Sequence, residues 1–119
     1  MSEILNDELK TIVSAADDKK AFDIKVLKIS DLTTIGDYFV ILSGNSKRQV
    51  LSISDEIDDK MKEAGYELLN KEGYDTGKWV LLDFGDIVVH VFHKEDREFY
   101  NLERLWIDAE EVEVDVASF

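Results

Sequence analysis

The chain has 119 residues, with 27 Asp or Glu against 14 Lys or Arg, so its formal net charge at pH 7 is −13. This length fits a single domain, and the absence of cysteine excludes disulfide bonds, cysteine-bound metal clusters and a thiol nucleophile. Nucleic-acid phosphates bind basic surfaces, so the charge argues against direct nucleic-acid binding and favours a basic protein partner.

The first predicted elements are a helix and a strand. Apolar residues recur at helical spacing from Ile4 to Ala16, which predicts a helix over residues 3–20. From Phe22 the apolar period becomes two, which predicts a half-buried strand ending near Ile29. The acidic N-terminal residues lack the features of a secretory signal, and no apolar run nears the roughly 18 residues of a membrane span. We therefore expect a cytoplasmic protein that does not bind membranes.

A buried strand and a capped helix are predicted next. Residues 38–42 are apolar on both faces, as in an interior strand of a sheet. Ser46 and Gln49 have the spacing of a capping box, in which each side chain accepts a hydrogen bond from the backbone of the other. The helical apolar repeat that follows ends at Gly65, a residue that favours a C-terminal cap.

The next segment predicts a β-hairpin. Residues 66–69 predict a short strand and residues 70–78 a loop. Two apolar strands, residues 79–84 and 87–92, then flank Gly85-Asp86, the spacing of a two-residue hairpin turn.

In this hairpin the pairing register divides the side chains of the two strands between two faces. One face is wholly apolar and is the predicted core. The other carries Trp79, Leu81, Asp83, Val88, His90 and Phe92. Asp83 and His90 become diagonal neighbours there, so an acid/base pair is conceivable. No nucleophile accompanies them, which favours a structural or binding histidine. His90 and His93 face opposite sides of a strand, which argues against a shared metal.

The C-terminal third combines aromatic residues with acidic charge. Helical spacing predicts a helix over residues 95–106, with Phe99 and Trp106 in the core and Trp79 and Tyr100 as interface candidates. Beyond it lies either a mobile acidic tail or an added edge strand. The order of elements predicts an α/β (α+β) fold, a mixed sheet flanked by helices.

Long ordered motifs over residues 4–109 resemble a known family. In chain order they are Gly36-Asp37-Tyr38-Phe39-Val40-Ile41, Gly44-Asn45-Ser46, Arg48-Gln49-Val50, Glu72-Gly73, Gly77, Trp79-Val80-Leu81-Leu82-Asp83, Gly85-Asp86-Ile87-Val88-Val89-His90-Val91-Phe92 and Arg97-Glu98-Phe99-Tyr100-Asn101-Leu102-Glu103-Arg104-Leu105-Trp106. They closely resemble the ribosomal silencing factor family, also called Iojap-like. We accordingly expect one such domain over residues 1–109 and an acidic tail over residues 110–119.

The resemblance implies a binding protein, not an enzyme. Members of the family bind the large ribosomal subunit through its protein fourteen and block joining of the small subunit. The family's fold resembles that of nucleotidyltransferases, whose metal-binding acids flank one apolar residue. This sequence lacks that metal-binding triad of acidic residues, so we expect no metal and no cofactor. The alternative is a nucleotide-binding transferase that keeps the ancestral activity of the fold.

The resemblance also implies which residues meet the partner. They are Trp79, Asp83, Phe84, His90, Arg97 and Tyr100. The hairpin register places Trp79, Asp83 and His90 on one face and Phe84 on the other. The apolar residues of the C-terminal third leave homodimer formation open.

Overall fold

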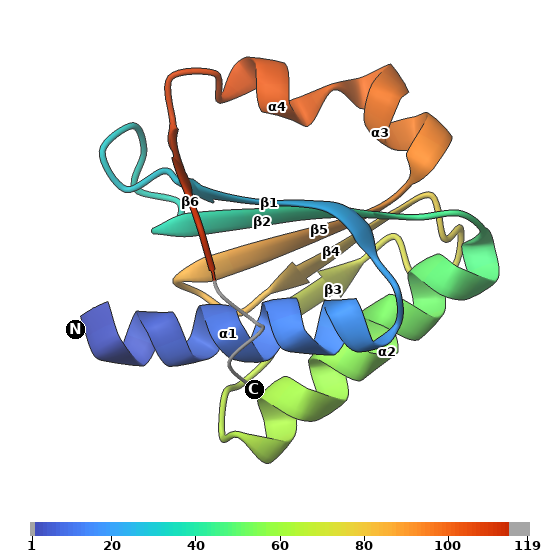
Figure 1. Ribbon diagram of the computed structural model, residues 1–119, viewed down its shortest axis with the longest axis horizontal. Helices are drawn as coiled ribbons and strands as arrows, with labels where there is room; N and C mark the ends of the chain where they lie inside the picture. The colour runs from blue at the N-terminus through green and yellow to red at the C-terminus, as the bar shows by residue number, and fades with distance from the viewer. Residues whose placement is uncertain (1, 115–119) are drawn as a thin grey trace.

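The computed structural model describes residues 2–114 and contains a six-stranded sheet with helices on both faces (Figure 1). Its elements are α1 Ser2–Asp18, β1 Phe22–Lys28, β2 Tyr38–Gly44, α2 Lys47–Glu63, β3 Asn70–Glu72, β4 Trp79–Asp83, β5 Ile87–His93, α3 Lys94–Tyr100, α4 Leu102–Leu105 and β6 Glu110–Val112. The strand order is β3-β4-β5-β2-β1-β6. Strands β2 and β5 run parallel, and the other neighbouring pairs are antiparallel. The predicted mixed sheet flanked by helices is confirmed.

The sheet separates two layers of apolar side chains. Helices α1 and α2 cover one face, and α3 and α4 cover the other (Figure 1). The larger core lies under α1 and α2, where Val50, Ile53, Ile57 and Met61 of α2 are fully buried. The smaller core lies under α3 and α4 and consists of Leu27, Ile29, Phe39, Ile41, Val88, Phe92 and Leu102. Strand β2 lies between β5 and β1, as its apolar character on both faces predicts.

The N-terminal cap of α2 differs in one detail from the predicted capping box. Ser46 Oγ accepts a hydrogen bond from the Gln49 backbone N–H at 3.1 Å, as expected. Gln49 Oε1, however, accepts from the backbone N–H of Asn45 and not from that of Ser46. The Gln49 amide also donates to the carbonyls of Lys19 and Lys20 at 3.2 and 3.0 Å. This side chain therefore joins the start of α2 to the end of α1.

The strand predicted at residues 66–69 is wrong, because these residues form no regular structure. The edge strand is β3, Asn70–Glu72, inside the segment predicted as a loop. All three of its residues are exposed and polar, and they pair with β4 through the backbone. A strand without apolar side chains has no alternating pattern, which explains why the sequence did not reveal it.

The helix predicted over residues 95–106 is interrupted. Asn101 takes a left-handed backbone conformation (φ 47°, ψ 55°) and separates α3 from α4. Phe99, predicted in the core, is 80% exposed, whereas Leu102 is buried. Trp106 is half-buried and packs edge-on against Phe39, with ring centroids 5.1 Å apart. The break redirects the helical apolar stripe, so part of it faces away from the sheet.

The acidic segment after Ala109 begins as an edge strand. Residues Glu110–Val112 form β6, antiparallel to β1, with Val112 opposite Val26. Residues 115–119 of the predicted tail lie outside the described residues, and the division into residues 1–109 and 110–119 stays a prediction. Within residues 2–114, no helix combines the length and apolar character that crossing a membrane requires.

Candidate functional site

The β4–β5 hairpin has the predicted register. Trp79 lies opposite Phe92, Leu81 opposite His90, and Asp83 opposite Val88. Because side chains alternate along a strand, these six residues share the face of the hairpin that lies toward α3 and α4. Gly85 adopts the positive φ, 93°, that the two-residue turn requires.

Phe84 lies on the opposite face. It is 9% exposed and belongs to the larger core under α1 and α2. The structure therefore separates Phe84 from Trp79, Asp83 and His90, with which the resemblance groups it.

His90 is an acceptor for Trp79. The indole Nε1–H of Trp79 donates to His90 Nδ1 at 3.1 Å. His90 is 4% exposed, and its ring meets the ring of Phe39 edge-on, with centroids 4.6 Å apart. Desolvation by burial lowers the pKa of His90 to about 4, so the imidazole is neutral at pH 7. Its Nδ1 accepts a hydrogen bond, so the single proton of the neutral ring resides on Nε2, which is buried without a partner.

Asp83 forms no pair with His90. Its Oδ1 accepts a hydrogen bond from the backbone N–H of Gly85 at 2.8 Å, which stabilises the hairpin turn. The acid/base pair that the hairpin register made conceivable is therefore not formed. Nowhere in residues 2–114 do three or more His, Asp or Glu side chains gather as metal ligands would.

Aromatic rings continue from the hairpin to the molecular surface. Besides His90, Trp79 contacts two rings: it stacks on Phe92, with ring centroids 4.8 Å apart, and lies 5.0 Å from the ring of Tyr100 of α3. Tyr100 is 50% exposed and contacts Phe99 edge-on. We call Trp79, Phe99 and Tyr100 the aromatic surface. Exposed rings of this kind are typical of protein interfaces, where Trp and Tyr contribute much of the binding energy.

Arg97 faces inward, away from the aromatic surface. It is 9% exposed, and its Nε donates to Glu103 Oε1 at 2.9 Å. Its Nη1 donates to Ser43 Oγ at 2.8 Å and to the backbone carbonyl of Asp23. The hydrogen bond from Arg97 is the main cause that lowers the pKa of Glu103, and Lys25 adds to the effect at 3.3 Å.

Leu105 and Ile107 were not identified as surface residues from the sequence. They are 76% and 78% exposed and follow the aromatic surface along the chain. A straight helix over residues 95–106 would have placed Leu105 with Leu102 on the buried stripe. The signal that could have revealed the difference is Asn101, since asparagine tolerates the left-handed conformation that interrupts a helix.

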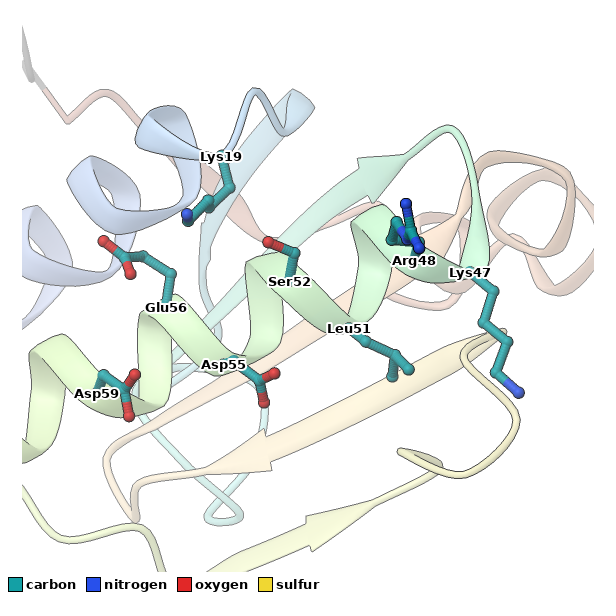
Figure 2. A pocket seen from close by; sticks show the side chains of 8 residues that line it. All are labelled: Lys19, Lys47, Arg48, Leu51, Ser52, Asp55, Glu56 and Asp59. Atoms are coloured by element: carbon teal, nitrogen blue, oxygen red, sulfur yellow. The ribbon is translucent and has the colours of Figure 1, made fainter.

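An open groove of about 710 Å³ lies along α2 (Figure 2). Helix α2 covers the face of the sheet opposite to α3 and α4 (Figure 1). It is lined by Lys19, Lys47, Arg48, Leu51, Ser52, Asp55, Glu56 and Asp59. Both signs of charge are interspersed along it, and no histidine or cysteine lines it. Of its carboxylates, Asp55 accepts a hydrogen bond from the Tyr74 hydroxyl at 2.9 Å.

Comparisons with known proteins identify the family. The family model described as "Ribosomal silencing factor during starvation" matches residues 2–118. The chain is 48% identical over 107 residues to Ribosomal silencing factor RsfS of Bacillus subtilis, covering 90% of this chain and 91% of that protein.

A solved structure from Chromobacterium violaceum superposes with a TM-score of 0.83 at 35% identity, covering 92% of this chain and 91% of that chain. The mouse "Mitochondrial assembly of ribosomal large subunit protein 1" is 32% identical over 102 residues, which are 83% of this chain and 45% of that protein. The chain belongs to the ribosomal silencing factor family.

Proposed function

We propose that this protein represses translation by binding the large ribosomal subunit through ribosomal protein fourteen and blocking the small subunit from joining. Family membership supports a role on the ribosome, and the name of the mouse relative supports the large subunit. The observation that carries the proposal is the aromatic surface, which exposes Phe99 and Tyr100 next to the half-buried Trp79.

The charge of the chain favours a protein contact over an RNA contact. With a net charge of −13, the molecule is repelled by phosphates and attracted by basic protein surfaces. The ribosome offers both, so binding through a basic ribosomal protein keeps the acidic body off the RNA. Complementary charge would also orient the encounter before the aromatic rings make contact.

The resemblance implies six residues as partner-binding, and the structure supports two kinds of role for them. Trp79, Asp83 and Tyr100 are partly exposed or exposed and meet the partner directly. Phe84 and His90 are buried and support the hairpin from its two faces. The sixth, Arg97, is buried and faces inward.

Repression of this kind requires no chemistry. The buried neutral His90 and the hydrogen-bonded Asp83 offer no accessible acid/base pair. A body of 13.7 kDa that occupies the joining surface excludes the small subunit by its volume. Its affinity need only exceed that of subunit association under the conditions of repression.

A subunit-joining assay tests the proposal. Purified protein is mixed with isolated large subunits, small subunits are added, and the products are separated on a sucrose gradient. We expect the protein to co-sediment with the large subunit and to reduce the amount of joined ribosomes as its concentration rises. Failure to co-sediment, or unchanged joining at saturation, would contradict the proposal. Light scattering of the free protein shows in the same preparation whether it is a homodimer.

Thermal unfolding tests the transferase alternative. A ligand that binds only the folded state raises the melting temperature. We expect nucleoside triphosphate with Mg²⁺ to leave the melting temperature unchanged. A rise that depends on nucleotide concentration would revive the alternative.

A further inference from the structure

Helix α3 is attached to the sheet by a charged side chain. Of its seven residues, Lys94–Tyr100, Arg97 is the only one that is buried. The two large apolar residues of the helix, Phe99 and Tyr100, are 80% and 50% exposed. A surface helix normally docks through an apolar stripe, and α3 has none facing the sheet.

The guanidinium of Arg97 connects α3 to three other elements. It donates to Ser43 Oγ of β2, to the Asp23 carbonyl of β1 and to the Glu103 carboxylate of α4. Glu103 in turn forms an ion pair with Lys25 of β1 at 3.3 Å. Hydrogen bonds to ionised groups are stronger than neutral ones, and the planar fork of arginine donates in several fixed directions.

The backbone of β1 is shaped to supply one of these acceptors. Asp23 has a positive φ of 52°, and the pairing of β1 with β2 is irregular between Phe22 and Lys25. A bulge of this kind releases a residue from the ladder of strand hydrogen bonds. The Asp23 carbonyl is thereby available to Arg97.

The position of α3 determines where Tyr100 lies. Tyr100 is three residues after Arg97 on the same short helix, and its ring is 5.0 Å from that of Trp79. We propose that Arg97 is a positioning residue of the partner-binding surface, which holds α3 so that Tyr100 lies against Trp79, and that it does not itself contact the partner. This inference rests on the proposed function for its effect on binding, but its effect on Tyr100 can be measured in the free protein.

The first test compares Arg97→Met with Arg104→Met. Both variants remove one arginine from the same layer, but Arg104 is exposed and makes none of these contacts. Nuclear Overhauser effects between the rings of Tyr100 and Trp79 report the placement of α3. We expect Arg97→Met to lose them and to bind large subunits about tenfold more weakly. Arg104→Met should retain them and bind within about twofold of the wild type.

A double-mutant cycle separates positioning from direct contact. If Arg97 acts through Tyr100, Arg97→Met should weaken binding little further in a Tyr100→Ala background. Additive losses would overturn the proposal, since they would show that Arg97 contributes to binding independently of Tyr100. Unchanged Overhauser effects in a folded Arg97→Met variant would overturn it as well.

Two further variants change the Arg97–Glu103 pair more conservatively. Arg97→Lys retains a cation for Glu103 but lacks the fork, so we expect a partial loss of both signals. If Arg97→Met does not fold, Glu103→Gln removes the carboxylate charge at a partly exposed site and should show the same loss of the Overhauser effects in weaker form. If the wild type fails to bind large subunits, the proposed function is wrong, while the measurements on the free protein still decide the role of Arg97.

Discussion

Trp79 and His90 form a hydrogen-bonded pair on the face of the β4–β5 hairpin that lies toward α3 and α4. In this pair the indole Nε1–H donates to His90 Nδ1 at 3.1 Å. The bond satisfies the polar atom of a half-buried tryptophan and sets the tautomer of a buried histidine. It also fixes the plane of the indole, which stacks on Phe92 and contacts the ring of Tyr100. A residue that looks catalytic in the sequence therefore serves to orient a binding residue.

Trp79→Ala should weaken binding to the large subunit by more than about 1 kcal/mol, because tryptophan at the centre of an interface contributes much of its energy. Trp79→Phe keeps a ring against Tyr100 but loses the hydrogen bond to His90, so a smaller loss is expected. Binding is measured by co-sedimentation after circular dichroism has shown that each variant folds. Unchanged binding by a folded Trp79→Ala variant would assign Trp79 to the core alone.

His90 should make the protein less stable as the pH falls from about 6.5 to about 4. Its pKa is about 4 in the folded state, against the ordinary histidine value of 6.5 in the unfolded chain. Between these values the unfolded chain binds more protons, so stability is lost as the pH falls through this window and is fully present above it. A pKa difference of 1 between the folded and the unfolded chain corresponds to about 1.4 kcal/mol of stability, so the whole difference for His90 amounts to about 3 kcal/mol.

Denaturant unfolding at several pH values measures this dependence. In His90→Phe the part of the slope that arises from this histidine should disappear. The control is His93→Asn, which removes the other histidine, keeps a side chain able to cap α3 and leaves the Trp79–His90 hydrogen bond in place. Equal slopes in the wild type and His90→Phe would show that His90 does not cause the dependence.

Gly73→Ala should destabilise the protein by more than about 2 kcal/mol, because a left-handed backbone and a close contact act together. Gly73 has a φ of 79°, and a Cβ there would lie 2.0 Å from the carbonyl oxygen of Trp79. Gly65 has a φ of 90° with nothing within 4 Å of an added Cβ. Gly65→Ala should therefore cost only about 1 kcal/mol, the conformational part. Similar losses of stability in the two variants would refute the steric contribution at Gly73.

The hairpin could be predicted from the sequence because two local signals agree there. An apolar strand on each side of Gly85-Asp86 leaves one favourable register, and that register places Trp79, Asp83 and His90 on one face. The apolar character of both faces of β2 and the serine cap of α2 also depend on residues that are close together in the sequence, so both could be predicted.

The contacts of Arg97 could not be predicted in this way. One of its acceptors is the backbone carbonyl of Asp23, 74 residues earlier in the chain. This carbonyl is free to accept because the pairing of β1 is irregular there, and no pattern of residues in the sequence predicts that irregularity. From the sequence, a charged residue is expected at the surface and a phenylalanine in the core, since buried arginines are rare. In α3 both expectations fail, because Arg97 is buried and Phe99 is exposed.

Leu102 and Leu105 offer a direct test of how α4 lies on the sheet. Leu102 is 9% exposed and belongs to the smaller core, whereas Leu105 is 76% exposed. Leu102→Ala should lower the free energy of unfolding by about 2 to 4 kcal/mol, since it removes buried methyl groups and leaves a cavity. Leu105→Ala should change it by less than about 0.5 kcal/mol, as substitutions at exposed positions usually do.

Urea unfolding measures both leucine variants. A continuous helix over residues 95–106 would bring the two leucines onto one stripe, so comparable losses of stability would contradict the break at Asn101. If Leu105→Ala keeps its stability but binds large subunits more weakly, the partner contact extends beyond the aromatic surface onto α4. Because Leu105 adds nothing to the core, such a loss can be assigned to the interface and not to unfolding.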